Sequence, residues 1–164
     1  MSEHTEGHYK VDSFNLDHTK VTAPFVRLAA KKVGEKGDVV SKFDIRFCQP
    51  NKEFMTTGAI HTLEHLVAEY IRDEMDGVID FSPMGCRTGF YLLLAGDYES
   101  ADIVPLLKEM FIFIRDFHDE VPGASAKDCG NYLDMNLPMA NYLAERFLRE
   151  VLIDIRPERL VYPE

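Results

Sequence analysis

The segment Lys42–Cys48 alternates apolar with polar residues, and few local structures accommodate that pattern. Successive side chains of a β-strand point to opposite faces of a sheet, so alternation places one kind of residue on each face. Here the apolar set is Phe43, Ile45 and Phe47, and the polar set is Asp44, Arg46 and Cys48. We therefore predict a half-buried strand whose polar face is either wet or covered by a partner subunit.

In the rest of the chain, apolar residues recur either with the spacing of a β-strand or with that of a helix. Strand-like segments are Tyr9–Leu16, Phe25–Val33, Val78–Phe81 and Gly89–Ala95, and we expect the last two to pair as a hairpin. Helical steps of three and four residues fill Gly58–Met75, Asp102–Phe117 and Leu137–Ile153. Strands grouped mainly before helices predict an α+β fold, in which an antiparallel β-sheet has helices packed on one face as a two-layer sandwich.

No repeat, low-complexity run or linker divides the sequence, so we expect residues 1–164 to form a single domain, with residues 1–10 as a flexible N-terminus. Lys and Arg total 18 against 28 Asp and Glu, a net charge of −10 that argues against binding to nucleic acid or to an anionic membrane. No apolar run reaches the length of a membrane span, and the polar N-terminus lacks the core of a signal peptide. We therefore expect a cytoplasmic protein, and its three widely spaced cysteines fit a reducing compartment.

The motif HTLEH, His61 to His65, lies inside the strongest helical pattern of the chain. Positions four apart share one face of a helix, so both imidazoles can point at a single metal ion. Glu64 falls near the same face, where it could act as a general acid/base. The alternative is a pair of surface histidines that happen to share a face.

A third metal ligand must come from another part of the chain. Cys129 is the best candidate because it lies in DCGNY, where the following glycine lets the backbone approach closely. Two imidazoles and a thiolate leave one position open on a tetrahedral ion, and this donor set accommodates several divalent metals. A buried structural thiol remains an equally good interpretation of this cysteine.

Other residues carry weaker signals. Cys86 lies in the glycine-flanked turn SPMGCRTG, where Arg87 could favour a reactive thiolate, although small residues are common in such turns. Cys48 has no partner pattern, and we interpret it as structural. Arg46 could bind an anionic group of a ligand or be a solvated strand residue, and His18, after an aspartate, is ambiguous.

Taken together, five motifs resemble one known family. FNLDH, KFDIRFCQPN, HTLEH, SPMGCRTG and CGNY occur in the order seen in the S-ribosylhomocysteine lyases, the LuxS family, and the likeness runs from about Phe14 to the last helix. The resemblance implies cleavage of S-ribosylhomocysteine to homocysteine and 4,5-dihydroxy-2,3-pentanedione, the precursor of the autoinducer-2 quorum signal, by carbonyl migration and β-elimination. It also implies a homodimer with both sites at the subunit interface.

The resemblance further implies roles for particular residues. One divalent metal per subunit, Fe(II) with Zn or Co as substitutes, would be held by His61, His65 and Cys129. Cys86 and Glu64 would be the acid/base pair. The positions that match substrate-binding residues, some of them contributed by the neighbouring subunit, are Ser13, His18, Arg46 and Asp80.

Two other functions fit parts of the same pattern. Inverzincin-type metallopeptidases also place H-x-x-E-H on a helix with the glutamate as general base, but they take an acidic third ligand, for which Glu145 is a candidate. A metal-stapled interaction domain would use the metal for folding alone, so that replacing Glu64 would have no effect on function.

Overall fold

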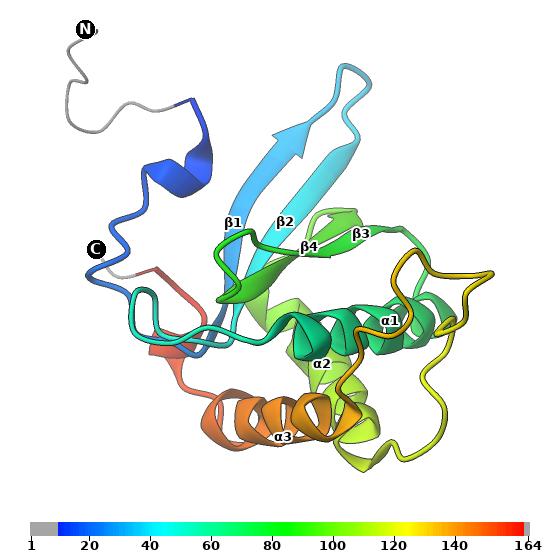
Figure 1. Cartoon of the computed structure of the whole chain (residues 1–164). Coiled ribbons are helices and arrows are strands. Elements are labelled where there is room, and N and C mark those ends of the chain that lie inside the picture. The colour runs from blue at the N-terminus through cyan, green and yellow to red at the C-terminus, as the bar shows by residue number, and fades with distance from the viewer. Residues whose placement is uncertain (1–9, 163–164) are drawn as a thin grey trace, which may run out of the picture.

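The computed structural model describes residues 10–162 and contains one antiparallel sheet of four strands (Figure 1). The strands are β1 (Phe25–Val33), β2 (Val39–Arg46), β3 (Val78–Pro83) and β4 (Gly89–Ala95), and they lie in the order β1-β2-β4-β3. The hairpin predicted for the last two strands is confirmed, and β1 has the predicted bounds. β2 begins three residues before the predicted strand and ends at Arg46.

The helices lie on one side of this sheet (Figure 1). They are α1 (Thr57–Glu74), α2 (Ser100–Asp116) and α3 (Leu137–Phe147), and the last continues into a π-helical turn, Leu148–Leu152. The N-cap of α2 is Glu99, which forms a capping box with Asp102, so this helix begins earlier than predicted. The α+β fold is confirmed, and no described helix is long and apolar enough to cross a membrane.

The core lies between the sheet and the helices. Phe43 and Ile45 of β2 are fully buried there, as the alternation of the sequence predicts, and they join a cluster of residues from all three helices. The same alternation stops at the end of the strand. Phe47 and Cys48 are both in the core because the chain turns after Arg46, and their backbone N–H groups both donate to the Thr88 carbonyl at 2.9 Å. The expectation that Cys48 lies on the polar face was therefore wrong, whereas its structural role fits its burial.

The predicted strand at Tyr9–Leu16 was also wrong. The described part of that segment contains a 3-10 turn, Asp12–Phe14, and Tyr9 lies outside the described residues, as does most of the predicted flexible N-terminus. The segment reads DSFNLD after Val11, and Asp, Ser and Asn side chains favour turns because they hydrogen-bond to nearby backbone groups. Its alternation was too loose to outweigh that preference.

The polar face of β2 is not wet. Asp44 and Arg46 are each 1% exposed, and Tyr162 of the C-terminal segment of the same chain contacts Asp44. The Tyr162 hydroxyl donates to Asp44 Oδ2 at 2.9 Å, a contact between residues 118 positions apart. The second face of the sheet is thus partly covered within one chain.

Candidate metal centre and catalytic cysteine

Two histidines of α1 and one cysteine of the α2–α3 loop come together as a metal-ligand group. One nitrogen from each of His61 and His65 and the Cys129 sulfur all lie within 4.8 Å of one another, and the three residues are half-buried. Cys129 Sγ is 3.4 Å from His61 Nε2. The loop that carries the cysteine passes alongside α1 and is coloured yellow to orange in Figure 1. This arrangement matches the ligand set that the sequence indicated.

Backbone carbonyls of that loop orient both imidazoles. His61 Nδ1 lies 3.0 Å from the carbonyl oxygen of Asp134, and His65 Nδ1 lies 2.8 Å from that of Pro122. A carbonyl only accepts hydrogen bonds, so each Nδ1 carries a proton, and Nε2 is the nitrogen that the neutral ring can offer to a metal. Metal-bound histidines in proteins are oriented in this way, and the donor set therefore fits a divalent ion.

A buried threonine ties the loop to the helix beside His61. Thr62 is fully buried, and its hydroxyl donates to the Gly58 carbonyl at 2.7 Å and accepts from the Asn136 backbone N–H at 2.8 Å. A Cβ at Gly58 would lie 3.3 Å from side-chain atoms of Asn136 and Asp134, so glycine permits this close packing. Thr62 thereby holds the segment whose carbonyl orients His61.

Close packing also supports the other histidine. Gly123 has a φ of +70°, and a Cβ there would lie 3.3 Å from His65 Nδ1. Glycine adopts this left-handed conformation without steric cost and leaves room for the ring. At the third residue of the group, the Asn131 backbone N–H donates to Cys129 Sγ at 3.4 Å. The loop therefore supplies a ligand, two orienting carbonyls and a donor to the sulfur.

Cys86 is exposed in the turn between β3 and β4. Its sulfur lies 3.0 Å from the hydroxyl of Thr88, whose side chain is buried. Arg87, which the sequence suggested as the neighbouring cation, instead stacks its guanidinium over the Phe54 ring at 4.5 Å. Nothing in the sequence pointed to Thr88, because its importance depends on which strand lies beside it.

The strand that pairs with β4 at this point is β2, and it carries the buried charged residue Arg46. Arg46 pairs with Gly89 in the register of β2 and β4, and a Cβ at Gly89 would lie 2.5 Å from the Ile45 carbonyl oxygen. The Arg46 guanidinium donates to Asp44 through Nε at 3.0 Å and Nη2 at 2.7 Å, and to Thr88 Oγ1 through Nη1 at 2.9 Å. Burial alone would lower the pKa of Arg46, but the hydrogen bonds and charge of Asp44 outweigh burial and raise this pKa.

The predicted substrate residues fall into three places. His18, Arg46 and Cys86 line one cleft of about 530 Å³, which we call the Cys86 cleft. Ser13 lines a second cavity of about 260 Å³, which also contacts Arg46. Asp80 is exposed on β3, where it accepts a hydrogen bond from Ser82 Oγ at 2.8 Å. Glu64 is half-buried on α1 beside the metal-ligand group.

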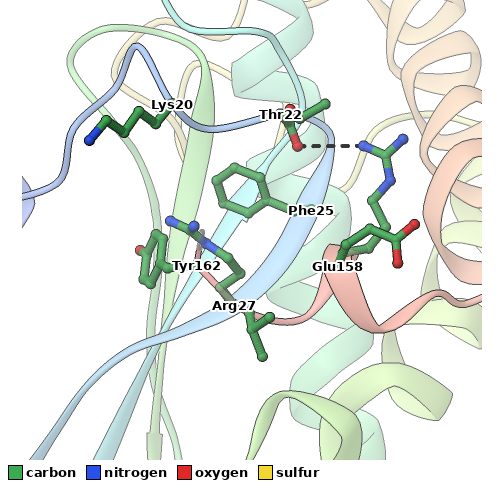
Figure 2. A pocket seen from close by; sticks show the side chains of 8 residues that line it. Lys20, Thr22, Phe25, Arg27, Glu158 and Tyr162 are labelled. Atoms are coloured by element: carbon green, nitrogen blue, oxygen red, sulfur yellow. Dashed lines mark hydrogen bonds between the residues drawn. The ribbon is translucent and has the colours of Figure 1, made fainter. Parts of the chain in front are cut away.

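A further cavity, of about 320 Å³, lies between β1 and the C-terminal segment (Figure 2). In it the Arg27 guanidinium lies between the rings of Phe25 and Tyr162. Its nitrogens are buried without a described hydrogen-bond partner, and Nη2 is 3.9 Å from Asp44 Oδ2. Burial, opposed by Asp44 and reinforced by Arg46, lowers the pKa of Arg27 to about 9. None of the metal ligands lines this cavity.

These observations describe an α+β fold in which two histidines and one cysteine could hold a metal ion and another cysteine, Cys86, is exposed in a separate turn, and such a set of residues fits a metal-dependent enzyme. The acidic third ligand of a metallopeptidase is not supported, because Cys129 completes the cluster and Glu145 pairs with Arg149 at 3.1 Å. The family model of S-ribosylhomocysteinase (LuxS) matches residues 11–158. The chain therefore belongs to the S-ribosylhomocysteinase (LuxS) family.

Curated relatives support this membership over nearly the whole chain. An S-ribosylhomocysteine lyase of Clostridium beijerinckii is 50% identical over 158 residues, which cover 94% of this chain and 98% of the relative. The S-ribosylhomocysteine lyase of Clostridium acetobutylicum is 52% identical over 160 residues, with 94% and 99% covered. That of Thermus thermophilus is 51% identical over 140 residues, with 85% and 90% covered.

Proposed function

We propose that this chain cleaves S-ribosylhomocysteine to homocysteine and 4,5-dihydroxy-2,3-pentanedione. The observation that carries the proposal is the match of the LuxS family to residues 11–158, a span that includes the metal-ligand group and Cys86. The relatives are named for this reaction at about half identity over most of their length. The product is the precursor of a quorum signal, so the activity serves autoinducer synthesis.

His61, His65 and Cys129 would hold one divalent metal, Fe(II) in our proposal, with Zn or Co as substitutes that the same donors accept. When bound, the metal supplies Lewis-acid stabilisation of negative charge on the sugar oxygens. Cys86 and Glu64 move protons between neighbouring carbons on the two sides of the sugar, and each must alternate between base and acid. Once the carbonyl has moved so that the thioether sulfur is on the carbon β to it, homocysteine leaves by elimination.

Ser13, His18, Arg46 and Asp80 hold the substrate in this proposal. The position of His18 and Arg46 in the same cleft as Cys86 supports it. Arg46 uses three of its five N–H donors on Asp44 and Thr88, so two remain for the cavities that it lines. We assign the reaction to the cytoplasm, in keeping with three cysteines that form no disulfide.

We further propose that two copies of the chain form a homodimer and complete each other's sites. The metal-ligand group and the Cys86 cleft share no lining residue within one chain, although the reaction needs both at one sugar. Since His18, Arg46 and Cys86 lie together, a second subunit would present all three to the metal of the first. In a symmetric dimer this exchange creates two equivalent sites.

The reaction is tested by mixing anaerobically purified protein of measured metal content with S-ribosylhomocysteine and following release of free thiol. We expect release from the native chain and none from Cys86→Ala, which should keep its metal. Cys129→Ala should lose the metal and the activity together. Arg149→Ala, which removes an exposed ion pair on α3, is the control and should behave as the native protein. A folded, metal-loaded native protein that releases no thiol would refute the assignment.

Glu64→Gln distinguishes an enzyme from a metal-stapled interaction domain. An enzyme predicts a folded, metal-bound variant with little turnover, because the amide cannot accept or return a proton. Full activity in Glu64→Gln would exclude a catalytic role for this residue.

The shared site is tested by combining two inactive variants, Cys86→Ala and Cys129→Ala, after mild unfolding and refolding together. Random pairing makes half of the dimers mixed, and each mixed dimer has one site built from two native contributions, so about a quarter of native activity should return. No recovery, with mixed dimers demonstrated by mass after one of the two variants has been labelled with ¹⁵N, would place both cysteines in the same subunit's site.

A further inference from the structure

A continuous chain of hydrogen bonds connects the buried carboxylate of Asp44 to the sulfur of Cys86. Asp44 binds Arg46 in a bidentate pair, Arg46 Nη1 lies 2.9 Å from Thr88 Oγ1, and Thr88 Oγ1 lies 3.0 Å from Cys86 Sγ. We call these four residues the Arg46 network. Three of them are at least 96% buried, and only Cys86 reaches the surface. The network therefore runs from the interior to the reactive atom.

The direction of the last hydrogen bond depends on whether Cys86 is a thiol or a thiolate. A guanidinium has only donors, so Arg46 donates and Thr88 Oγ1 accepts. The single hydroxyl hydrogen of Thr88 stays available for Cys86, its other described partner, and a thiolate, which carries no hydrogen, can only accept it. A hydrogen bond donated by a hydroxyl that is itself polarised by a cation stabilises a thiolate more than it stabilises a thiol.

The backbone holds Thr88 in this orientation. Its carbonyl accepts hydrogen bonds from the N–H groups of both Phe47 and Cys48 at 2.9 Å, which ties it to the end of β2. Gly89 allows the close approach of β4 that this contact needs. The β-branched side chain of threonine has few rotamers, so a fixed backbone also fixes the hydroxyl.

We propose that Thr88 is a positioning residue that fixes the Cys86 sulfur and favours its thiolate by relaying the positive charge of Arg46. The inference rests on the proposed function, in which Cys86 is a base. In that step the thiolate takes a proton from a carbon next to the carbonyl, an S–H bond forms, and the C–H electron pair moves toward the carbonyl oxygen. The proton later returns to the neighbouring carbon, and Thr88 keeps its own hydrogen throughout.

Several other charged or titratable groups face the same cleft or interact with Cys86 and will contribute to its pH behaviour. They are His18, Lys52 and Glu53 along the cleft, together with Arg46, Tyr91 and Cys48. Among the cations of this set, Arg46 is linked to the sulfur by two hydrogen bonds, whereas the adjacent Arg87 stacks on Phe54. The test must therefore alter the Thr88 hydroxyl and leave these groups in place.

Thr88→Val removes the hydroxyl and keeps the shape of the side chain, and Thr88→Ser keeps the hydroxyl. The readout is the rate at which iodoacetamide alkylates Cys86 between pH 5 and pH 10, followed by peptide mass spectrometry so that the three cysteines are resolved. A hydrogen bond to a charged group is strong enough that Thr88→Val should slow alkylation of Cys86 at neutral pH roughly tenfold to a hundredfold. Its half-maximal pH should move upward, and Thr88→Ser should stay close to the native protein.

This assay needs no substrate, so it separates the inference from the proposed function. If thiol release fails but the alkylation profile shifts, the function is wrong and the relay stands. If the native protein is active and Thr88→Val has a native alkylation profile, the relay is overturned. In the expected case kcat falls in Thr88→Val with little change in KM, because the step that slows is proton transfer.

Two controls guard against a merely structural effect. Thr57→Val makes the same chemical change at an exposed position at the start of α1, and it should leave the profile and kcat unchanged. If Thr88→Val does not fold, Thr88→Ala removes the hydroxyl without retaining any branch and should show the same shift in alkylation. A native profile in folded Thr88→Ala would also refute the relay.

Discussion

The metal-ligand group and the Arg46 network both hold side chains in fixed positions, but they do so with different groups: backbone carbonyls in the first and charged side chains in the second. At the metal-ligand group, neutral backbone carbonyls orient two half-buried imidazoles, and the described partners of both Nδ1 atoms include no charged side chain. In the Arg46 network, the side chains of the buried Asp44 and Arg46 form an ion pair, and Arg46 donates a hydrogen bond to Thr88. The groups that orient the imidazoles in the first arrangement are therefore uncharged, whereas the second depends on a buried ion pair.

This difference predicts a difference in tolerance. Charges removed from water are costly unless they are fully paired, so a buried pair that loses one partner destabilises the fold strongly. A backbone carbonyl that moves away from its histidine changes the orientation of the imidazole but leaves no buried charge unpaired. The Arg46 network is also crowded, because Arg27 and Arg46 both face the single carboxylate of Asp44. We therefore expect mutations there to affect folding first and mutations around the metal-ligand group to affect metal affinity first.

Asp44→Asn should give the largest effect. It removes the carboxylate that faces two buried guanidiniums, and we expect about 3 to 5 kcal/mol less stability in urea unfolding followed by circular dichroism. Asp116→Asn removes an equivalent charge from the exposed pair with Arg115 and should leave stability nearly unchanged, because solvent screens that pair. Equal losses in the two variants would show that burial does not set the cost, and the contrast drawn here would fail.

Thr62→Val is the corresponding change beside the metal-ligand group. The loss of its hydroxyl leaves the Asn136 N–H and the Gly58 carbonyl with one partner fewer, at a cost of about 1 to 3 kcal/mol. Because Thr62 holds the segment that orients His61, metal affinity should also fall, about tenfold to a hundredfold in competition with a chelator. Thr62→Ser keeps the hydroxyl and should retain most of the affinity. Unchanged affinity in a destabilised Thr62→Val would limit this residue to a structural role.

Gly123→Ala probes His65 with a smaller effect on stability. The left-handed φ costs an alanine about 1 to 2 kcal/mol, and its Cβ would press on the imidazole at 3.3 Å. Gly37→Ala is a matched control, since it has a φ of +84° with no atom near the added Cβ. Both variants should lose similar stability, but Gly123→Ala alone should bind metal more weakly. A parallel loss of affinity in Gly37→Ala would attribute the effect to global stability.

The two regions also differ in how far the sequence predicts them. His61 and His65 are four positions apart on a helix of strong periodicity, so their common face follows from local geometry. The cysteine chosen for its place in the glycine-containing segment DCGNY is the one that completes the cluster. The alternation in β2 likewise predicted that Asp44 and Arg46 share a face. Periodicity does not say what covers that face, because Tyr162 arrives from 118 positions away.

The failures have related physical causes. Thr88 was missed because its importance depends on strand register, which brings Arg46 beside it only after β2 and β4 pair. The carbonyls of Pro122 and Asp134 were missed because every residue has a carbonyl, and only the path of the loop selects these two. Cys48 was assigned to the wrong face because alternation says nothing about where a strand ends. Local spacing thus predicts ligands, and long-range packing decides what orients them.

The smallest effect concerns Cys48, which lies in the core close to the Arg46 network. Burial, followed by the charge of Glu53, raises the pKa of this thiol above its ordinary value of 9.0, because a thiolate there would be poorly solvated. A pKa that is higher in the folded than in the unfolded state gives stability that is present below pH 9.0 and lost as the pH rises through the folded value. In urea unfolding between pH 7 and pH 10, Cys48→Ala should therefore be less stable than the native chain at pH 7 and should lose less stability on the alkaline side. Parallel curves for the two proteins would mean that the thiol does not ionise differently on folding, and that this part of the core is more open to water than its 2% exposure indicates.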